Sequence, residues 1–135
     1  NMERGQTPFT PAAGLLIQMH RRLSDITEGG IDTERAKIRT LAEDFRARLA
    51  ASDLPFVPFS ESPSNAVTAL SVTCGTSAHS IFETLKDHYN IWICPNGGAL
   101  RDSVFRVGHL GALTVDDNET LIAAFTDCKR KGLIQ

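Results

Sequence analysis

Cysteine is scarce in this sequence of 135 residues, which has only Cys74, Cys94 and Cys128. An odd number of widely spaced cysteines without a CxxC pair argues against a disulfide framework and against a zinc site built on thiolates. Each cysteine has apolar or small neighbours. The sequence therefore predicts buried structural thiols in a reducing, cytoplasmic environment.

An excess of one charge and long apolar runs are also missing. The formal net charge is −2 and the basic residues are scattered, so the chain lacks the basic footprint of a nucleic-acid-binding protein. No apolar run reaches the length of a membrane span, and the polar start Asn1-Met2-Glu3-Arg4 does not have the pattern of a signal peptide. We expect a cytoplasmic protein without nucleic-acid or membrane partners, and the Asn1-Met2 start suggests a cloned fragment.

Several catalytic motifs are absent as well. No GxSxG nucleophile elbow occurs, and Gly97-Gly98 lacks the lysine and the helix start that a phosphate-binding loop needs. None of the four histidines pairs with another at metal-ligand spacing, so we expect no metal site. His109 is the histidine that adjoins an unusual residue, Arg106.

Periodic apolar residues are present and predict regular structure over one domain, residues 1–135. Thr10-Pro11 has the features of a helix start, Gly29-Gly30 ends that helix, and Asp32 is expected to cap a second one. The alternation of short segments predicts four strands, at Phe56–Phe59, Ala66–Thr73, Ile91–Cys94 and Val104–Val107.

Two more helices are expected, one capped by Thr76 or Ser77 and one opened by the capping-box pattern at Thr114. This order predicts an α+β fold: a small antiparallel-type sheet with helices packed on one face, preceded by a long N-terminal helix. The large aromatic residues expected in the core are Phe45, Phe82, Trp92 and Phe125.

Arg106 lies in the middle of the apolar stretch FRVGHLG, residues 105–111. Alternation along a strand places Phe105 and Val107 on one face and Arg106 on the other. A guanidinium remains charged at any working pH and is suited to a planar carboxylate. Two interpretations stay open: an ion pair with a neighbour such as Asp102 or Asp116, or a site for an anionic ligand.

Three stretches, which together extend over nearly the whole chain, carry a resemblance to a known family. NIWICPNGGALRDSVFRVGHLGALTVDDNETLIAAF, with GQTPFTPAAGLL and EGGIDTERAKIRTLAEDFRARL before it, resembles the C-terminal small domain of class V PLP-dependent aminotransferases. The similarity is greatest to the alanine–glyoxylate, serine–pyruvate and 2-aminoethylphosphonate–pyruvate group. It implies the small-domain fold of the fold type I PLP enzymes.

The resemblance also implies roles for particular residues. Arg106 would bind the carboxylate of an amino acid or 2-oxo acid substrate, and Thr7, with Gln6 and Thr10 beside it, would contact the phosphate of pyridoxal 5'-phosphate bound by a neighbouring subunit. This implies a homodimer. The catalytic lysine of the family would lie upstream, since Lys37, Lys86, Lys129 and Lys131 occur in helical segments. The chain alone is therefore expected to have no catalytic residue and no transaminase activity.

Two alternatives remain at this stage. The chain could be a free-standing α+β module that binds a ligand or dimerises, or it could belong to a cysteine desulfurase of the same class, with Cys94 or Cys74 as the reactive thiol. The sequence does not identify the amino donor or the keto acceptor.

Overall fold

The computed structural model describes residues 2–5, 7 and 9–135 of the chain. These residues form two compact units, residues 1–36 and 37–135. The first unit holds a short 3-10 helix, Met2–Arg4, the helix α1, Ala13–Gly29, and the first turns of α2, Ile31–Ala50. The remaining elements all belong to the second unit.

The helix α1 begins two residues later than the sequence predicted, which had Thr10 as the cap and Pro11 as the first helical residue. Its first residue is Ala13, and Ala12 precedes it without a side-chain cap. Gly30, at a positive φ of 86°, ends the helix as expected, because glycine adopts this conformation without steric cost. Asp32 does not cap α2: that helix already begins at Ile31, so the carboxylate lies in the first turn, where it favours the helix dipole.

The second unit contains a four-stranded sheet in the order β1-β2-β4-β3, with all neighbours antiparallel. The strands are β1, Phe56–Pro58, β2, Val67–Val72, β3, Cys94–Pro95, and β4, Val104–Gly108. A second 3-10 helix, Gly98–Leu100, lies between β3 and β4. The α+β class is therefore confirmed.

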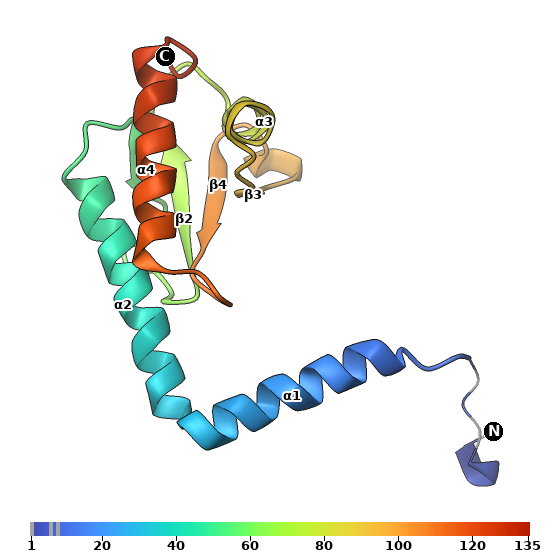
Figure 1. The fold of residues 1–135 in the computed structure, drawn as a ribbon. Coiled ribbons are helices and arrows are strands. Elements are labelled where there is room, and N and C mark those ends of the chain that lie inside the picture. The colour runs from blue at the N-terminus through green and yellow to red at the C-terminus, as the bar shows by residue number, and fades with distance from the viewer. Residues whose placement is uncertain (1, 6, 8) are drawn as a thin grey trace. The chain divides into compact units, whose positions relative to one another are not determined.

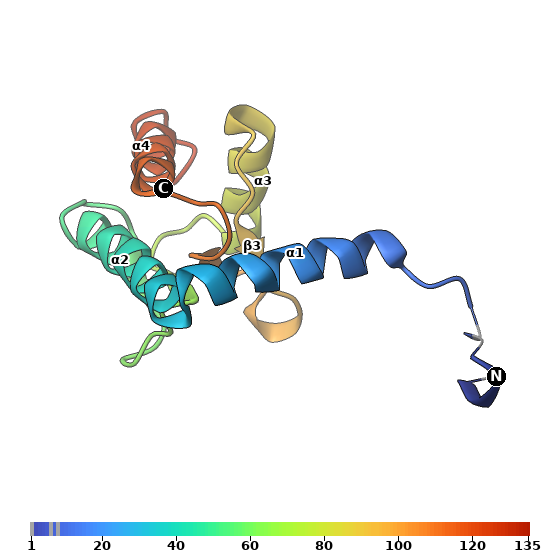
Figure 2. The same cartoon turned by 60° about the horizontal axis from the view of Figure 1, so that its bottom comes forward.

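Three helices pack on one face of this sheet: α2, α3, Ala78–Tyr89, and α4, Val115–Arg130. In both views α4 lies between α2 and α3 (Figures 1 and 2). Side chains from all three helices and from the facing side of the sheet form one hydrophobic core, in which Phe45, Phe105 and Phe125 are fully buried. The expectation that Phe45, Phe82 and Phe125 are core residues is confirmed.

The structure of the segment before β3 differs from the sequence-based prediction in two respects. Only Cys94–Pro95 forms a strand, whereas Ile91–Cys94 was expected to do so. Trp92 was expected in the core, but it is 70% exposed and rests edge-on against the Phe82 ring. The left-handed Asn90 turns the chain out of α3, and the Ile91 amide then bonds to Leu85 of that helix instead of a strand. From this run Ile93 is buried in the core, and Ile91 packs against the core while partly exposed.

Candidate functional site

Arg106 lies on the sheet face opposite the three helices. Its two neighbours along β4, Phe105 and Val107, are buried in the core, as alternation predicted. Across the ladder Arg106 is paired with Ala69 of β2 and with Cys94 of β3. Directly paired residues of antiparallel strands place their side chains on the same face. The guanidinium therefore shares this face with a small alanine and an exposed thiol.

The Arg106 guanidinium retains unused donors. Its Nη2 donates a hydrogen bond to the Pro95 carbonyl at 3.2 Å, and its Nε is buried without a partner. Among the residues that the structure describes, no carboxylate lies within ion-pair distance of Arg106, and Asp102 pairs with Arg101 instead. The ion pair with Asp102 or Asp116 is therefore not formed. A half-buried guanidinium with spare N–H groups can accept a planar anion by two parallel hydrogen bonds.

The edge strand β3 supplies the contacts around this arginine. The Pro95 carbonyl that receives Arg106 also receives a long contact from the Cys94 Sγ, at 3.9 Å. Asn96, in the turn that follows, donates from Nδ2 to the Val104 carbonyl of β4 at 2.8 Å. Sequence reasoning missed Pro95 and Asn96, because a proline carbonyl and an asparagine amide leave no periodic signal.

His109 follows β4 and is buried on the helix side of the sheet, with 1% of its surface exposed. Its Nε2 shares a hydrogen bond of 2.8 Å with the Thr68 hydroxyl, and its ring lies 5.3 Å from that of Phe45. Burial lowers the pKa of His109 to about 4, and the nearby Arg46 charge acts in the same direction. The ring is therefore neutral near pH 7 and belongs to the core, on the other face from Arg106.

The residues expected at a cofactor phosphate lie in the first unit. Thr7 and Thr10 are exposed, and the Thr7 hydroxyl donates to the Phe9 carbonyl at 2.7 Å. Gln6 lies outside the described residues. Thr7 and Thr10 belong to the first unit and Arg106 to the second. A role of these two threonines in one site with Arg106 therefore stays a prediction.

The thiols do not share one environment. Cys128 is buried, and burial raises the pKa of its thiol, whereas Cys74 is half-buried and Cys94 is exposed. The prediction of three buried thiols is therefore wrong for Cys94. Its strand is a sheet edge, and its side chain is on the face that the helices leave open.

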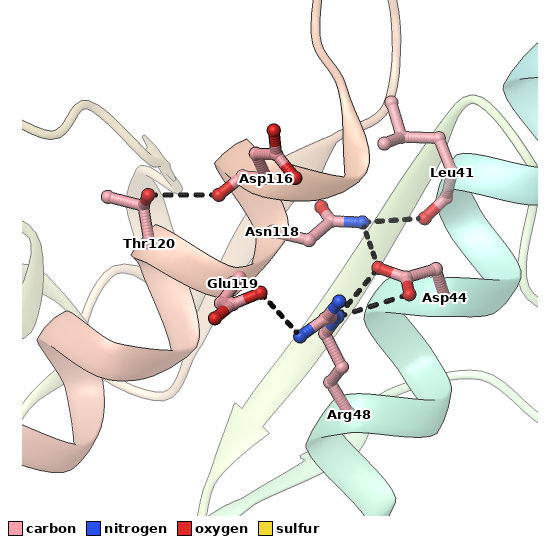
Figure 3. A network of polar contacts seen from close by, with 7 residues as sticks. All are labelled: Leu41, Asp44, Arg48, Asp116, Asn118, Glu119 and Thr120. Carbon is pink, nitrogen blue, oxygen red and sulfur yellow. Dashed lines mark hydrogen bonds and ion pairs between the residues drawn. The ribbon is translucent and has the colours of Figure 1, made fainter.

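A polar network joins α2 to α4 on the helix side (Figure 3). Asn118 donates from Nδ2 to the Leu41 carbonyl and to Asp44, both at 2.9 Å, and Arg48 binds Asp44 through Nε at 2.9 and 3.1 Å. The Asn118 hydrogen bond and the Arg48 guanidinium lower the pKa of Asp44. Glu119 extends the network to Arg48. Every group here is used in holding two helices together.

A hollow of about 700 Å³ lies along α4 beside Tyr89 and Ile91. Its Asp127 already pairs with Lys131 at 2.6 Å and with Arg130, and it accepts a 2.6 Å hydrogen bond from Tyr89. That hydrogen bond to the carboxylate raises the pKa of Tyr89 to about 12, so the phenol keeps its proton near neutral pH. Asp127 and Tyr89 are therefore already paired within the protein.

Within the described part of the chain, no group of three or more histidine, cysteine, aspartate or glutamate side chains is placed to hold a metal ion. Of the helices in residues 2–5, 7 and 9–135, none combines the length and apolar content needed to cross a bilayer.

Comparison with known proteins gives relatives of two kinds, some named soluble hydrogenase subunits and others named aminotransferases. No protein-family model matches the chain. It is 30% identical over 121 residues to the soluble hydrogenase 42 kDa subunit of Anabaena cylindrica, covering 90% of this chain and 31% of that protein. It is also 31% identical over 114 residues to a serine–glyoxylate aminotransferase of Hyphomicrobium methylovorum, covering 82% of this chain and 28% of the relative.

Solved structures share the fold. An alanine–glyoxylate aminotransferase from Nostoc sp. superposes with a TM-score of 0.79 at 20% identity, over 90% of this chain and 33% of that one. An aspartate aminotransferase from Thermus thermophilus gives a TM-score of 0.74 at 18% identity, over 96% of this chain and 36% of that one. The chain spans less than a third of the length of the curated relatives it matches.

Proposed function

We propose that this chain, whose homologues are class V aminotransferases, contributes a substrate-binding arginine, Arg106, to a transaminase that moves an amino group between an amino donor and a 2-oxo acid. The observation that carries the proposal is the Arg106 guanidinium itself. It occupies the sheet face opposite the helices, has no carboxylate partner among the described residues, and keeps a buried Nε without a hydrogen bond.

The chemistry of the site is suited to a carboxylate. A guanidinium presents its donors in a fixed plane, which matches the two oxygens of a carboxylate. Arg106 is fixed at one nitrogen by the Pro95 carbonyl and remains charged at every working pH. It would therefore hold the substrate carboxylate and set the orientation of the carbon that bears the amino or keto group.

Pyridoxal 5'-phosphate, when bound, would supply the electron sink for that carbon. From this chain the phosphate would meet Thr7 and Thr10, with Gln6 beside them. The exposed Thr7 and Thr10 hydroxyls fit such a contact, although Thr7 would first have to release its hydrogen bond to Phe9. A phosphate shared between subunits implies a homodimer.

Three of the four lysines form ion pairs, and the fourth lies on the surface of a helix. Lys129 pairs with Asp53 at 2.6 Å, Lys131 with Asp127 at 2.6 Å, and Lys86 with Asp87 at 3.3 Å, while Lys37 is exposed on α2. We therefore assign the cofactor-bearing lysine to a large domain outside this chain, with residues 1–135 as the small domain of the enzyme. The comparisons do not favour a free-standing module or a cysteine desulfurase.

Substitution of Arg106 in the enzyme that contains this chain tests the proposal. A hydrogen bond to a charged group contributes about 1.5–3 kcal/mol, so Arg106→Ala should lower kcat/KM for carboxylate substrates roughly tenfold to a few hundredfold. Arg106→Lys keeps the charge and loses the planar fork, so it should restore only part of that loss. Steady-state kinetics measures both variants.

Arg101→Ala is the matched control, because Arg101 has a surface ion pair with Asp102 and lies five residues before Arg106 in the sequence. It should leave kcat/KM unchanged. The free energy of unfolding of Arg106→Ala should fall by no more than about 2 kcal/mol, since the hydrogen bond to the Pro95 carbonyl is lost but no ion pair is broken. Unchanged kcat/KM in Arg106→Ala would contradict the proposed role.

A further inference from the structure

We infer that Asn96 is a positioning residue for Arg106, an inference that rests on the proposed function of that arginine. β3 has only two residues, and one of them, Pro95, has no N–H to donate to β4. The Asn96 side chain adds a bond one position beyond the Pro95–Phe105 pair that ends this ladder, because its Nδ2 donates to the Val104 carbonyl at 2.8 Å. This side chain therefore ties the end of the edge strand to β4.

The consequence reaches Arg106 through one peptide group. The Pro95 carbonyl belongs to the peptide that joins Pro95 to Asn96, and it accepts the hydrogen bond from Arg106 Nη2 at 3.2 Å. When Asn96 is held against Val104, this carbonyl is held beside the guanidinium. Because the guanidinium is planar, fixing one of its nitrogens restricts the plane in which the remaining donors lie.

Few other contacts could do the same. Ile93 anchors the segment before β3 in the core, with 5% of its surface exposed. The segment after Asn96 turns away through Gly97 and Gly98, and Gly98 has a positive φ of 57°. Glycines leave the backbone free to move. Asn96 is therefore the anchor that limits movement of the Pro95 carbonyl on its C-terminal side.

Cys94 provides a reporter for this arrangement. It is exposed, paired with Arg106 across the ladder, and its Sγ points to the same Pro95 carbonyl. Iodoacetate and iodoacetamide both react with its thiolate, forming an S–C bond and releasing iodide. The ratio of their two rates cancels the thiolate fraction and measures the local positive charge, because only iodoacetate is an anion.

The experiment compares this ratio at Cys94 in the 135-residue chain and its variants, with peptide mapping to separate Cys94 from Cys74 and Cys128. Arg106→Ala should lower the ratio about twofold to fivefold, as expected for loss of one adjacent charge in water. Asn96→Ala should lower it toward the Arg106→Ala value. Ser52→Ala removes another side-chain hydrogen bond to a backbone carbonyl, that of Leu49, and should leave the ratio unchanged.

A kinetic measurement in the intact enzyme complements the labelling. Asn96→Ala should raise KM for a carboxylate substrate about threefold to tenfold, the equivalent of one hydrogen bond, with kcat within about twofold. Asn96→Ala with an unchanged circular dichroism spectrum, rate ratio and KM would overturn the inference. If the variant unfolds, Asn96→Ser, which keeps a donor, must restore both ratio and KM, and its failure to do so would also overturn it.

The outcome is separable from that of the proposed function. The alkylation ratio uses no substrate, so it can show that Asn96 positions Arg106 even if Arg106→Ala proves to have normal kcat/KM. In the opposite case, a large loss in Arg106→Ala with a normal KM and ratio in Asn96→Ala would defeat the positioning role alone.

Discussion

At the scale of single residues, His109 shows how a polar side chain can be built into this core. The ring replaces water with one hydrogen bond to Thr68 and with contact to Phe45. From the sequence His109 was notable only for its place near Arg106. Continuing the alternation of Phe105 and Val107 past the end of β4 would have placed it on this helix-covered side, and its amide still bonds to the Ala66 carbonyl.

The buried imidazole predicts a pH-dependent stability. Its pKa is about 4 in the folded chain and near 6.5 when unfolded, so the unfolded state binds the proton first as the pH falls. The stabilisation is complete above about pH 6.5 and is lost between there and about pH 4. The loss should be about 3 kcal/mol, measured by urea unfolding at several pH values.

His109→Gln is neutral throughout this range and should flatten the pH profile in that window. His88→Gln, which changes an exposed histidine of α3, is the control and should retain the slope. An identical slope in His109→Gln and the unsubstituted chain would show that another group causes it.

At the scale of elements, local signals predicted the caps of α3 and α4 correctly, but not the starts of α1 and α2 or the edge of the sheet. Ser77 caps α3, accepting a hydrogen bond from the Ser80 amide, and Thr114 forms the expected capping box with Asp117. These motifs depend on residues three apart in the sequence. The extent of β3 depends instead on how the chain leaves α3. The apolar run of residues 91–93 therefore did not indicate that the strand after it has only two residues.

The polar network that joins α2 to α4 predicts a specific loss of stability. Asn118 is buried and donates to both Leu41 and Asp44 (Figure 3). Asn118→Ala should lower the free energy of unfolding by about 1–3 kcal/mol, since it leaves a buried carbonyl without its donor. Thermal or urea unfolding measures the change.

Thr120→Ala is the control for that measurement. It removes an exposed hydroxyl that donates to the Asp116 carbonyl one turn earlier on the same helix, and its effect should stay within about 0.5 kcal/mol. Equal effects of the two substitutions would mean that the hydrogen bonds from Asn118 to α2 add no stability beyond that of helix α4 itself.

At the scale of the whole molecule, the similarity to aminotransferases and the α+β fold expected from the sequence are confirmed. The FRVGHLG motif indicated the similarity to aminotransferases, and the order of the elements indicated the fold. What sequence could not supply was the division of the chain into two units, because α1 is amphipathic enough to suggest a buried face. Within the described residues, α1 has no buried side chain, and Leu15, Ile17 and Leu23 are all exposed.

This division predicts unequal protection along the chain. A helix of 17 residues without a buried face is marginally stable in water. In hydrogen exchange followed by mass spectrometry, amides of α1 should exchange at least about a hundredfold faster than those of β2, β4 and α4. The slowly exchanging amides of α2 should be those near Phe45, which is fully buried. Slow exchange throughout α1 would contradict the prediction.

Trp92, the single tryptophan of the chain, stands largely in solvent against the edge of Phe82. Its fluorescence will therefore be long-wavelength already in the native state, and unfolding will change its colour little. The fluorescence emission of this chain is therefore a poor measure of unfolding, but it is sensitive to anything that binds over Trp92. A shift to shorter wavelength, with the circular dichroism unchanged, would register the arrival of a covering partner or domain.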